Sequence, residues 1–224
     1  LSAACSRCLD IPGAQEASQM AFEALSAGNK GLAAGVLMRK ARCALLLGNT
    51  GQAAADYRNA AVRADNLRDR CESYSSYLLS LAYREIASAD LLLEHQKYAE
   101  IFSQIKFYPV EKNRKRQKKL HIGYLSPDFR QHVMFSFYYA LLACYDHEVF
   151  QVTCYSLTDV EDGYTEALRE LVDDWQSLSL QENSYESIAA KIHADRIDIL
   201  VDLAGHSAGS GLPILAWRPA LVQM

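Results

Sequence analysis

Apolar and polar residues alternate in short blocks through the second half of the chain, from residue 118 onward. Four apolar runs have the length and composition of buried strands, and the stretches between them repeat apolar residues at helical spacing. The expected strands are 120–126, 148–157, 175–180 and 197–205, and the expected helices are 134–145, 165–175 and 184–195. The first of these helices is expected to bury one face, formed by Met134, Phe137, Tyr138, Leu141, Leu142 and Tyr145. This alternation predicts a four-stranded parallel sheet that is covered on both faces and open at its fourth strand.

The first 70 residues follow a different pattern, because they are rich in alanine and show no strand-like alternation. They predict helices packed closely through small side chains. The residues Ala41, Gly48, Ala53, Tyr57 and Ala60 occupy the small and aromatic positions of a tetratricopeptide repeat. A weaker second match to the repeat, the fainter echo, lies 36 residues earlier. In it, Ala17, Ala21 and Ala24 align with Ala53, Tyr57 and Ala60. The alternative is an unrelated alanine-rich helical hairpin.

A basic run separates the two patterns. Helical periodicity continues over 72–107, and residues 112–119 then include six Lys or Arg. In an acidic chain, such a run is typical of a solvated connection between domains. We therefore expect helical repeats over 1–70, a helical linker over 71–117 and a Rossmann-like sheet lobe over 118–224.

Composition narrows the function classes. A net charge of −4 and a pI near 5.9 argue against a nucleic-acid-binding protein. No apolar run is long enough to cross a membrane, and the start of the sequence does not resemble a signal peptide. We therefore expect a cytoplasmic protein, or also a nuclear one in a eukaryote. Cys5 and Cys8 form a C-x-x-C pair, but no second pair follows at zinc-site spacing, so no metal site is predicted.

Two loops follow strands at the expected carboxyl edge of the sheet, where ligands of such folds bind. The first loop offers Asp128 and His132, and the second offers Gly205, His206 and Ser207. These short polar side chains suit hydrogen bonding to carbohydrate or hydroxyl groups. Asp128 has the alternative role of capping the following helix.

The second loop also matches G-x-S-x-G, the nucleophile elbow of serine hydrolases. In a hydrolase, a helix would start near residue 208 and would contain Pro213, which breaks helices. Pro213 instead suits the first turn of a later helix. The 17 residues after Ser207 contain neither Asp nor His to complete a triad. The pattern therefore does not indicate a hydrolase.

Three segments together resemble the amino-terminal lobe of the tetratricopeptide-linked glycosyltransferases. They are "KLHIGYLSPDFRQHVMFSF", "FQVTCYSL" and "IDILVDLAGHSAGSGLPILAWRPALVQM". This family includes the O-linked N-acetylglucosamine transferases and the plant SPINDLY-type O-fucosyltransferases. The resemblance covers 118–224, and the upstream repeat fits the usual architecture of the family.

The resemblance implies a GT-B enzyme, with two Rossmann-like lobes, that is inverting and independent of metal ions. It implies that His132 lines the active-site cleft, as a candidate base, and that His206 matches a position that is histidine in many but not all members. The carboxyl lobe of the family binds the sugar nucleotide, so UDP-N-acetylglucosamine is expected as the donor of the complete enzyme. No cofactor is expected on this chain, which alone is expected to be inactive.

The expected partners are acceptor proteins, held through the helical repeats, and the nucleotide-sugar-binding carboxyl lobe. The expected activity is transfer of N-acetylglucosamine or a related sugar to Ser or Thr hydroxyls. The alternative function is a non-catalytic tetratricopeptide adaptor, in which a degenerate lobe only holds a partner.

Overall fold

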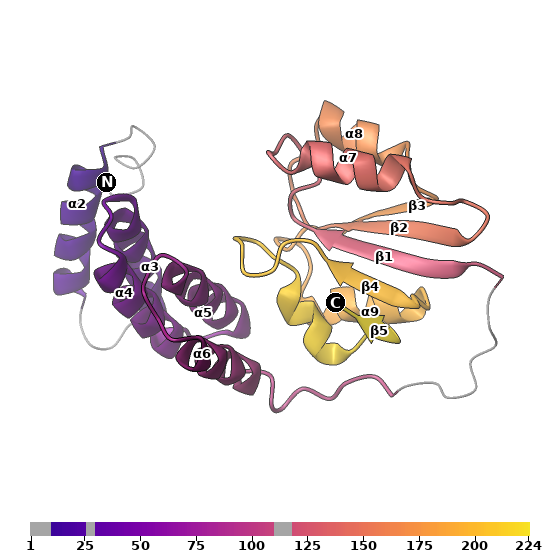
Figure 1. Ribbon diagram of the computed structural model, residues 1–224. Helices are drawn as coiled ribbons and strands as arrows, with labels where there is room; N and C mark the ends of the chain where they lie inside the picture. The colour runs from indigo at the N-terminus through magenta and orange to yellow at the C-terminus, as the bar shows by residue number, and fades with distance from the viewer. Residues whose placement is uncertain (1–9, 26–29, 110–117) are drawn as a thin grey trace. The chain divides into compact units, whose positions relative to one another are not determined.

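The computed structural model describes residues 10–25, 30–109 and 118–224 (Figure 1). The chain forms two compact units. A helical unit extends to Ser103 and includes 206–208, and a sheet unit contains the rest of the chain from Gln104.

The helical unit consists, in its described part, of consecutive helices with short connections. They are α2 (Ile11–Ala24), α3 (Lys30–Leu46), α4 (Thr50–Arg63), α5 (Leu67–Leu81) and α6 (Ser88–Glu100). Side chains cap two of the starts: Asp10 accepts a hydrogen bond from the Gly13 N–H at 3.0 Å, and Asn66 accepts one from the Asp69 N–H at 2.9 Å. These bonds satisfy amides that have no partner inside the helix.

Helices α3 and α4 pack through the small residues of the predicted repeat. Ala41, Ala53 and Ala60 are fully buried, and Tyr57 is nearly so. Gly48, which joins the helices, has a φ of +80°, a conformation that favours glycine. The pattern positions are thus the packing positions of a close helical pair. The fainter echo in α2 lacks this burial, because Ala17 is only half-buried and the other two alanines are exposed.

The sheet unit contains a parallel sheet in the order β3-β2-β1-β4-β5. Its elements are β1 (Leu120–Ser126), α7 (Phe135–Ala143), β2 (Phe150–Ser156), α8 (Gly163–Arg169), β3 (Asp174–Ser177), α9 (Tyr185–Ala194), β4 (Ile199–Asp202), the 3-10 helix η1 (Leu212–Trp217) and β5 (Val222–Gln223). The parallel sheet with intervening helices is confirmed. The expected open edge at the fourth strand is wrong, because the two-residue strand β5 pairs with β4.

Helix α8 is shorter than the expected helix over 165–175. It ends at Arg169, and β3 already begins at Asp174. Pairing with the sheet decides this boundary: Trp175 pairs with Cys154 of β2, and Asp173 accepts a hydrogen bond from the Val152 N–H at 2.8 Å.

Opposite faces of β1 support two layers of the core. On one face, Ile122 and Tyr124 pack with α7 and α8 around the buried Phe129, Tyr138 and Leu168. On the other face, α9 and η1 cover the sheet (Figure 1). The fully buried residues Leu125, Tyr155, Ile188, Ile192, Ile197, Leu200 and Ile214 belong to the strands, helices and joints of this unit.

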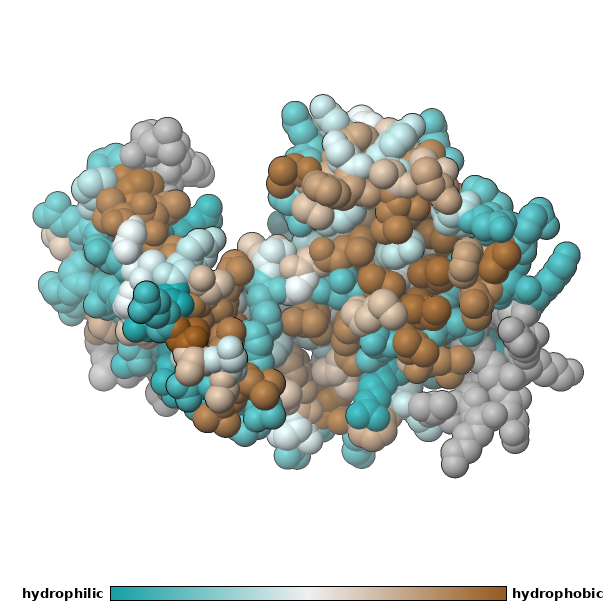
Figure 2. Space-filling view, viewed as in Figure 1, coloured by the Kyte–Doolittle hydropathy of each residue, from teal (hydrophilic) through white to brown (hydrophobic). Residues whose placement is uncertain are grey.

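Helix α7 is more exposed than its sequence predicts. Tyr138 and Leu142 are buried, as expected, but Phe137 is 67% exposed and Leu141 is 40% exposed. Figure 2 shows apolar side chains gathered over this helix. The expectation that all six large residues share the buried face is therefore wrong, since a face of one short helix accommodates fewer of them.

The segment 104–109 packs on the sheet unit. The Tyr108 N–H donates to the Trp217 carbonyl at 2.8 Å, and the Tyr108 ring stacks on His193 with centroids 4.0 Å apart. The Arg218 guanidinium lies 4.4 Å from the centroid of the Phe107 ring. These contacts join the later part of the predicted linker to η1 and α9.

Several sequence features lie outside the described residues, namely Cys5, Cys8 and most of the basic run over 110–117. Within the ranges that the structure describes, no helix combines the length and apolarity needed to cross a membrane. In the same ranges, no group of three or more His, Cys, Asp or Glu side chains is arranged to hold a metal ion.

Candidate active site at the carboxyl edge of the sheet

Three neighbouring strands of the sheet end in polar residues. Ser126 ends β1, Ser156 ends β2, and Asp202 ends β4. Ser126 pairs in register with Ser156, and Leu125 pairs with Asp202, so the three side chains belong to one stretch of the sheet edge. This edge is where parallel sheets bind ligands.

Ser126 shapes the turn that follows β1. Its Oγ accepts a hydrogen bond from the Asp128 N–H at 3.0 Å and lies 3.4 Å from the hydroxyl of Tyr138. The side chain of a serine thus closes the turn over Pro127, as serine hydroxyls often do in loops. The turn fixes Asp128 next to the end of the central strand.

Asp128 and His132 lie together in this loop. The Nε2 atom of His132 is 3.8 Å from Oδ1 of Asp128, and the His132 side chain is 32% exposed. The Met134 N–H donates to Nδ1 over a long 3.4 Å. A neutral ring therefore carries its proton on Nε2, and the weakly engaged Nδ1 lone pair is its proton-accepting site. The carboxylate of Asp128 lies on the Nε2 side of the ring.

Asp202 joins the candidate site in the structure, although it was not predicted from the sequence. Its Oδ2 accepts a hydrogen bond from the Gly205 N–H at 2.6 Å, and its Oδ1 is buried without a partner among the described residues. Burial raises the pKa of Asp202 to about 6, although backbone N–H groups of Gly205 and Ala204 partly oppose the shift. The available signal was an acidic residue at the end of an otherwise apolar strand.

Two carboxyl groups converge on Tyr138, which projects from α7 and is nearly fully buried. The pKa of Tyr138 is raised mainly by burial, and the charges of Asp128 and Asp202 raise it further, while the hydrogen bond with Ser126 lowers it. Groups from the ends of β1 and β4 therefore act on the same hydroxyl.

The Ser156 Oγ adds a second buried polar atom that lacks a partner in the described part of the chain. Buried polar atoms of this kind are uncommon in proteins and are typical of sites that receive a ligand or water.

Gly205, the third candidate of the sheet unit, forms the turn after β4. Its φ is +57°, which favours glycine, and no atom lies within 4 Å of the place where a Cβ would stand. The N–H of this residue is the one that binds Asp202. The structure therefore joins Gly205 to the strand end by a hydrogen bond.

His206 and Ser207 belong to the helical unit. The Nδ1 atom of His206 lies 3.0 Å from the Ser75 hydroxyl, and its ring lies 5.1 Å from that of Tyr98 and 5.2 Å from that of His95. Burial, and then the neighbouring His95, lower the pKa of His206 to about 4. His206 is therefore a neutral hydrogen-bonding group at physiological pH. Its convergence with His132 stays a prediction, as does that of Ser207.

The geometry around Ser207 does not match a nucleophile elbow. No helix starts directly after it; the next one, η1, begins at Leu212 and carries Pro213 in its first turn. The Ser207 Oγ is buried and has no partner among the described residues, so no histidine is positioned to activate it. The exclusion of a serine hydrolase is consistent with this arrangement.

Comparison with known proteins adds to this geometry. Residues 76–224 match the model of glycosyl transferase family 41. The chain belongs to this family. Its amino-terminal helices and parallel-sheet lobe are also found in an O-GlcNAc transferase mutant from Thermobaculum terrenum, with a TM-score of 0.70 and 25% identity over 99% of this chain and 45% of that one.

Plant relatives support the same assignment. Probable UDP-N-acetylglucosamine–peptide N-acetylglucosaminyltransferases named SPINDLY are 31% identical over 157 residues in Petunia hybrida and over 155 residues in Arabidopsis thaliana. Each alignment covers 66% of this chain, but only 16% of the petunia protein and 17% of the Arabidopsis protein. The family resemblance and the fold class drawn from the sequence are confirmed.

Because the pKa of Asp202 is raised, we expect Asp202→Asn to increase the stability of the fold by an amount that depends on pH. The folded protein binds a proton at Asp202 more tightly than the unfolded chain does, so the stability from this group is complete below about pH 4 and is lost as the pH rises through about 6. We expect Asp202→Asn to raise the free energy of unfolding at pH 8 by roughly 1–3 kcal/mol and to change it little at pH 4.

Urea unfolding followed by tryptophan fluorescence checks this prediction. Both tryptophans of the chain, Trp175 and Trp217, lie in the sheet unit and report on its unfolding. An equal effect of Asp202→Asn at both pH values would show that the carboxyl group is not held in its protonated form.

Proposed function

We propose that this chain forms the acceptor side of a protein O-glycosyltransferase that transfers N-acetylglucosamine from UDP-N-acetylglucosamine to Ser or Thr hydroxyls. The support is membership of family 41, together with the activity for which the plant relatives are named. The chain spans about a sixth of the length of these relatives and 45% of the bacterial enzyme, so the activity belongs to a longer polypeptide.

The observation that carries the proposal is the half-exposed imidazole of His132 beside Asp128 at the carboxyl edge of the sheet. In the proposed reaction, the acceptor hydroxyl oxygen attacks C1 of the sugar from the face opposite the nucleotide, and UDP leaves with the bonding electrons. His132 takes the proton of the hydroxyl, and Asp128 stabilises the resulting positive charge. We propose that the reaction inverts the anomeric centre and needs no metal ion.

Two buried strand-end groups suit the binding of hydroxyl or amide groups of the substrates. The Oδ1 atom of Asp202 accepts hydrogen bonds when ionised and donates one when protonated, and the Ser156 Oγ can do both. Because neither atom has a partner among the described residues, a substrate group that pairs with one of them offsets an existing desolvation cost.

The turn after β1 supports the proposal that this lobe binds the acceptor and not the phosphates of the donor. The segment Ser126-Pro127-Asp128 has no glycine, and Pro127 has no N–H to offer a phosphate. The Asp128 N–H is already bonded to Ser126, and its carboxylate would repel an anion. Pyrophosphate sites at such turns depend on glycine and on free amides.

We assign acceptor-protein binding to the helical unit and sugar-nucleotide binding to a separate lobe of the polypeptide. The helical pair α3 and α4 supports the first assignment, because stacks of such helical repeats present extended surfaces for protein partners.

A reducing compartment, the cytoplasm or the nucleus of a eukaryote, is also part of the proposal. The described cysteines Cys43, Cys71, Cys144 and Cys154 are all free thiols. Thiols persist where the redox environment keeps them reduced.

A transferase assay tests the proposed function. We expect the full-length polypeptide that contains this chain to add N-acetylhexosamine to Ser or Thr of acceptor peptides when it is given UDP-N-acetylglucosamine, as seen by mass spectrometry. GDP-fucose serves as the competing donor, because the plant relatives are named SPINDLY and the family includes SPINDLY-type O-fucosyltransferases. Acceptor peptides that are bound but left unmodified with either donor would contradict the proposal and favour the adaptor function.

A further inference from the structure

The first turn of α8 is bonded to the loop that carries His132. Asp162, the residue that caps α8, accepts hydrogen bonds at Oδ1 from the N–H groups of Tyr164 at 2.9 Å and Thr165 at 3.0 Å. Its second oxygen, Oδ2, accepts a hydrogen bond from the Gln131 N–H at 2.8 Å. Capping accounts for the first two bonds but not for the third, which joins residues 31 positions apart.

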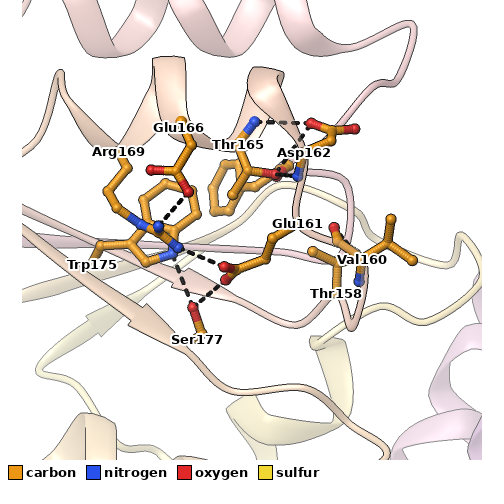
Figure 3. A network of polar contacts seen from close by, with 10 residues as sticks. Thr158, Val160, Glu161, Asp162, Thr165, Glu166, Arg169, Trp175 and Ser177 are labelled. Atoms are coloured by element: carbon orange, nitrogen blue, oxygen red, sulfur yellow. Dashed lines mark hydrogen bonds and ion pairs between the residues drawn. The ribbon is translucent and has the colours of Figure 1, made fainter.

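Thr165 makes a second connection to the same loop. Its Oγ1 donates to the carbonyl of Phe129 at 2.8 Å. The same atom accepts from the N–H of Asp162 at 3.1 Å (Figure 3). Thr165 and Phe129 are both fully buried, so this bond is shielded from water. Phe129 is also held by its ring, which packs against Tyr138 with centroids 5.3 Å apart.

Contacts of the preceding residue, Glu161, hold Asp162 in place. The carboxylate of Glu161 pairs with Arg169 at 2.9 Å and accepts a hydrogen bond from Ser177 of β3 (Figure 3). Arg169 also lies over the Trp175 ring, 5.3 Å from its centroid. The segment before α8 is therefore tied both to the helix and to the edge of the sheet.

We propose that Asp162 and Thr165 are positioning residues for His132. Together they bind the backbone of the loop at Phe129, through an acceptor, and at Gln131, through a donor. His132 directly follows Gln131, so the two bonds limit where its ring lies relative to Asp128. That this positioning matters for catalysis rests on the proposed function of His132. That Asp162 and Thr165 constrain the loop does not depend on that function.

The carboxylate of Asp162 is well suited to this task. The pKa of Asp162 is lowered, and the hydrogen bond from the Gln131 N–H is the largest cause. The bond to the loop and the ionised state of Asp162 therefore support each other, since an ionised acceptor makes the stronger hydrogen bond.

The chain offers a matched control in α9, which begins with another capping box. Ser184 accepts a hydrogen bond from the Ser187 N–H at 3.0 Å, and Ser187 accepts one from the Ser184 N–H at 3.0 Å. Among the described residues, the side-chain hydrogen bonds of this pair stay within residues 184–187. Removing the cap of α9 therefore tests the effect of capping alone.

The first experiment measures the loop in the 224-residue chain by NMR. We expect Asp162→Ala to speed hydrogen exchange of the Gln131 amide at least tenfold relative to the wild-type chain and to shift the ring signals of His132. Asp162→Asn keeps a side-chain acceptor and should restore part of both. Thr165→Val should shift the His132 signals, whereas Thr165→Ser should not.

Ser184→Ala should affect only the first turn of α9. The inference would be overturned if Asp162→Ala left the Gln131 amide and the His132 ring unchanged, or if Ser184→Ala changed them to the same extent.

The second experiment separates this inference from the proposed function. In the full-length enzyme, Asp162→Ala should lower kcat about tenfold and leave the KM for the sugar nucleotide within twofold. Loop changes by NMR with an unaltered kcat would support the positioning of His132 and contradict its role as base. A raised donor KM with an unaltered kcat would contradict positioning for the proton transfer.

Discussion

Replacing His132 by alanine is expected to lower the turnover of the full-length enzyme by about 10²- to 10⁴-fold, the usual contribution of a general base. The Nδ1 atom of the imidazole accepts only a long hydrogen bond of 3.4 Å from the Met134 N–H, Nε2 lies 3.8 Å from the Asp128 carboxylate, and the side chain is 32% exposed. Its loss removes the proton acceptor but no buried packing. The sheet unit should therefore remain folded.

The kcat of His132→Ala, measured with saturating donor and acceptor peptide, checks this prediction. His147→Ala is the matched control, because His147 is an exposed histidine of the same unit that lies beside Tyr145 and Asp173. It should leave kcat unchanged. The tryptophan fluorescence of both variants should match that of the wild type. A kcat for His132→Ala within about twofold of the wild-type value would exclude proton transfer by this residue.

Periodicity predicted most of the sheet unit because its central strands are largely buried and its helices are short. The strands over 120–126 and 148–157 agree closely with β1 and β2. The errors arose where tertiary contacts outweigh local pattern. Phe137 and Leu141 are apolar but exposed, and β5 is too short to give a periodic signal and exists only because it pairs with β4.

The candidate site could be predicted in part from strand ends. Asp128, His132 and Gly205 lie where the loops after β1 and β4 were expected, and Gly205 binds the strand end through Asp202. Asp202 and Ser156 were not predicted as site residues, because what distinguishes them is a buried atom without a partner. That property depends on the packing of neighbouring strands and helices, and the sequence signals it only at Asp202, as an acidic residue at the end of an apolar strand.

The hydrogen bond between Asp162 and the loop that carries His132 could not be predicted from the sequence either. A capping residue at the start of α8 is recognisable from the sequence, since Asp162 and Thr165 have the spacing of a capping box. The hydrogen bond from Gln131 depends on how α8 lies against the turn after β1. Because the two residues are 31 positions apart, no local sequence pattern predicts this contact.

The division of labour between acceptor and donor lobes is the central claim of this account. It predicts that the 224-residue chain does not bind UDP-N-acetylglucosamine with appreciable affinity. The turn after β1 offers a proline, an occupied amide and a carboxylate where a phosphate would need free N–H groups.

Calorimetric titration of this chain with UDP-N-acetylglucosamine tests the claim most directly. Tryptophan fluorescence and NMR dispersion of the same sample establish that the sheet unit is folded, so that missing heat cannot reflect an unfolded chain. The account predicts no saturable binding in the micromolar range. Saturable micromolar binding, lost in a variant of the β1 or β4 loop such as His132→Ala, would place the donor site in this lobe and contradict the account.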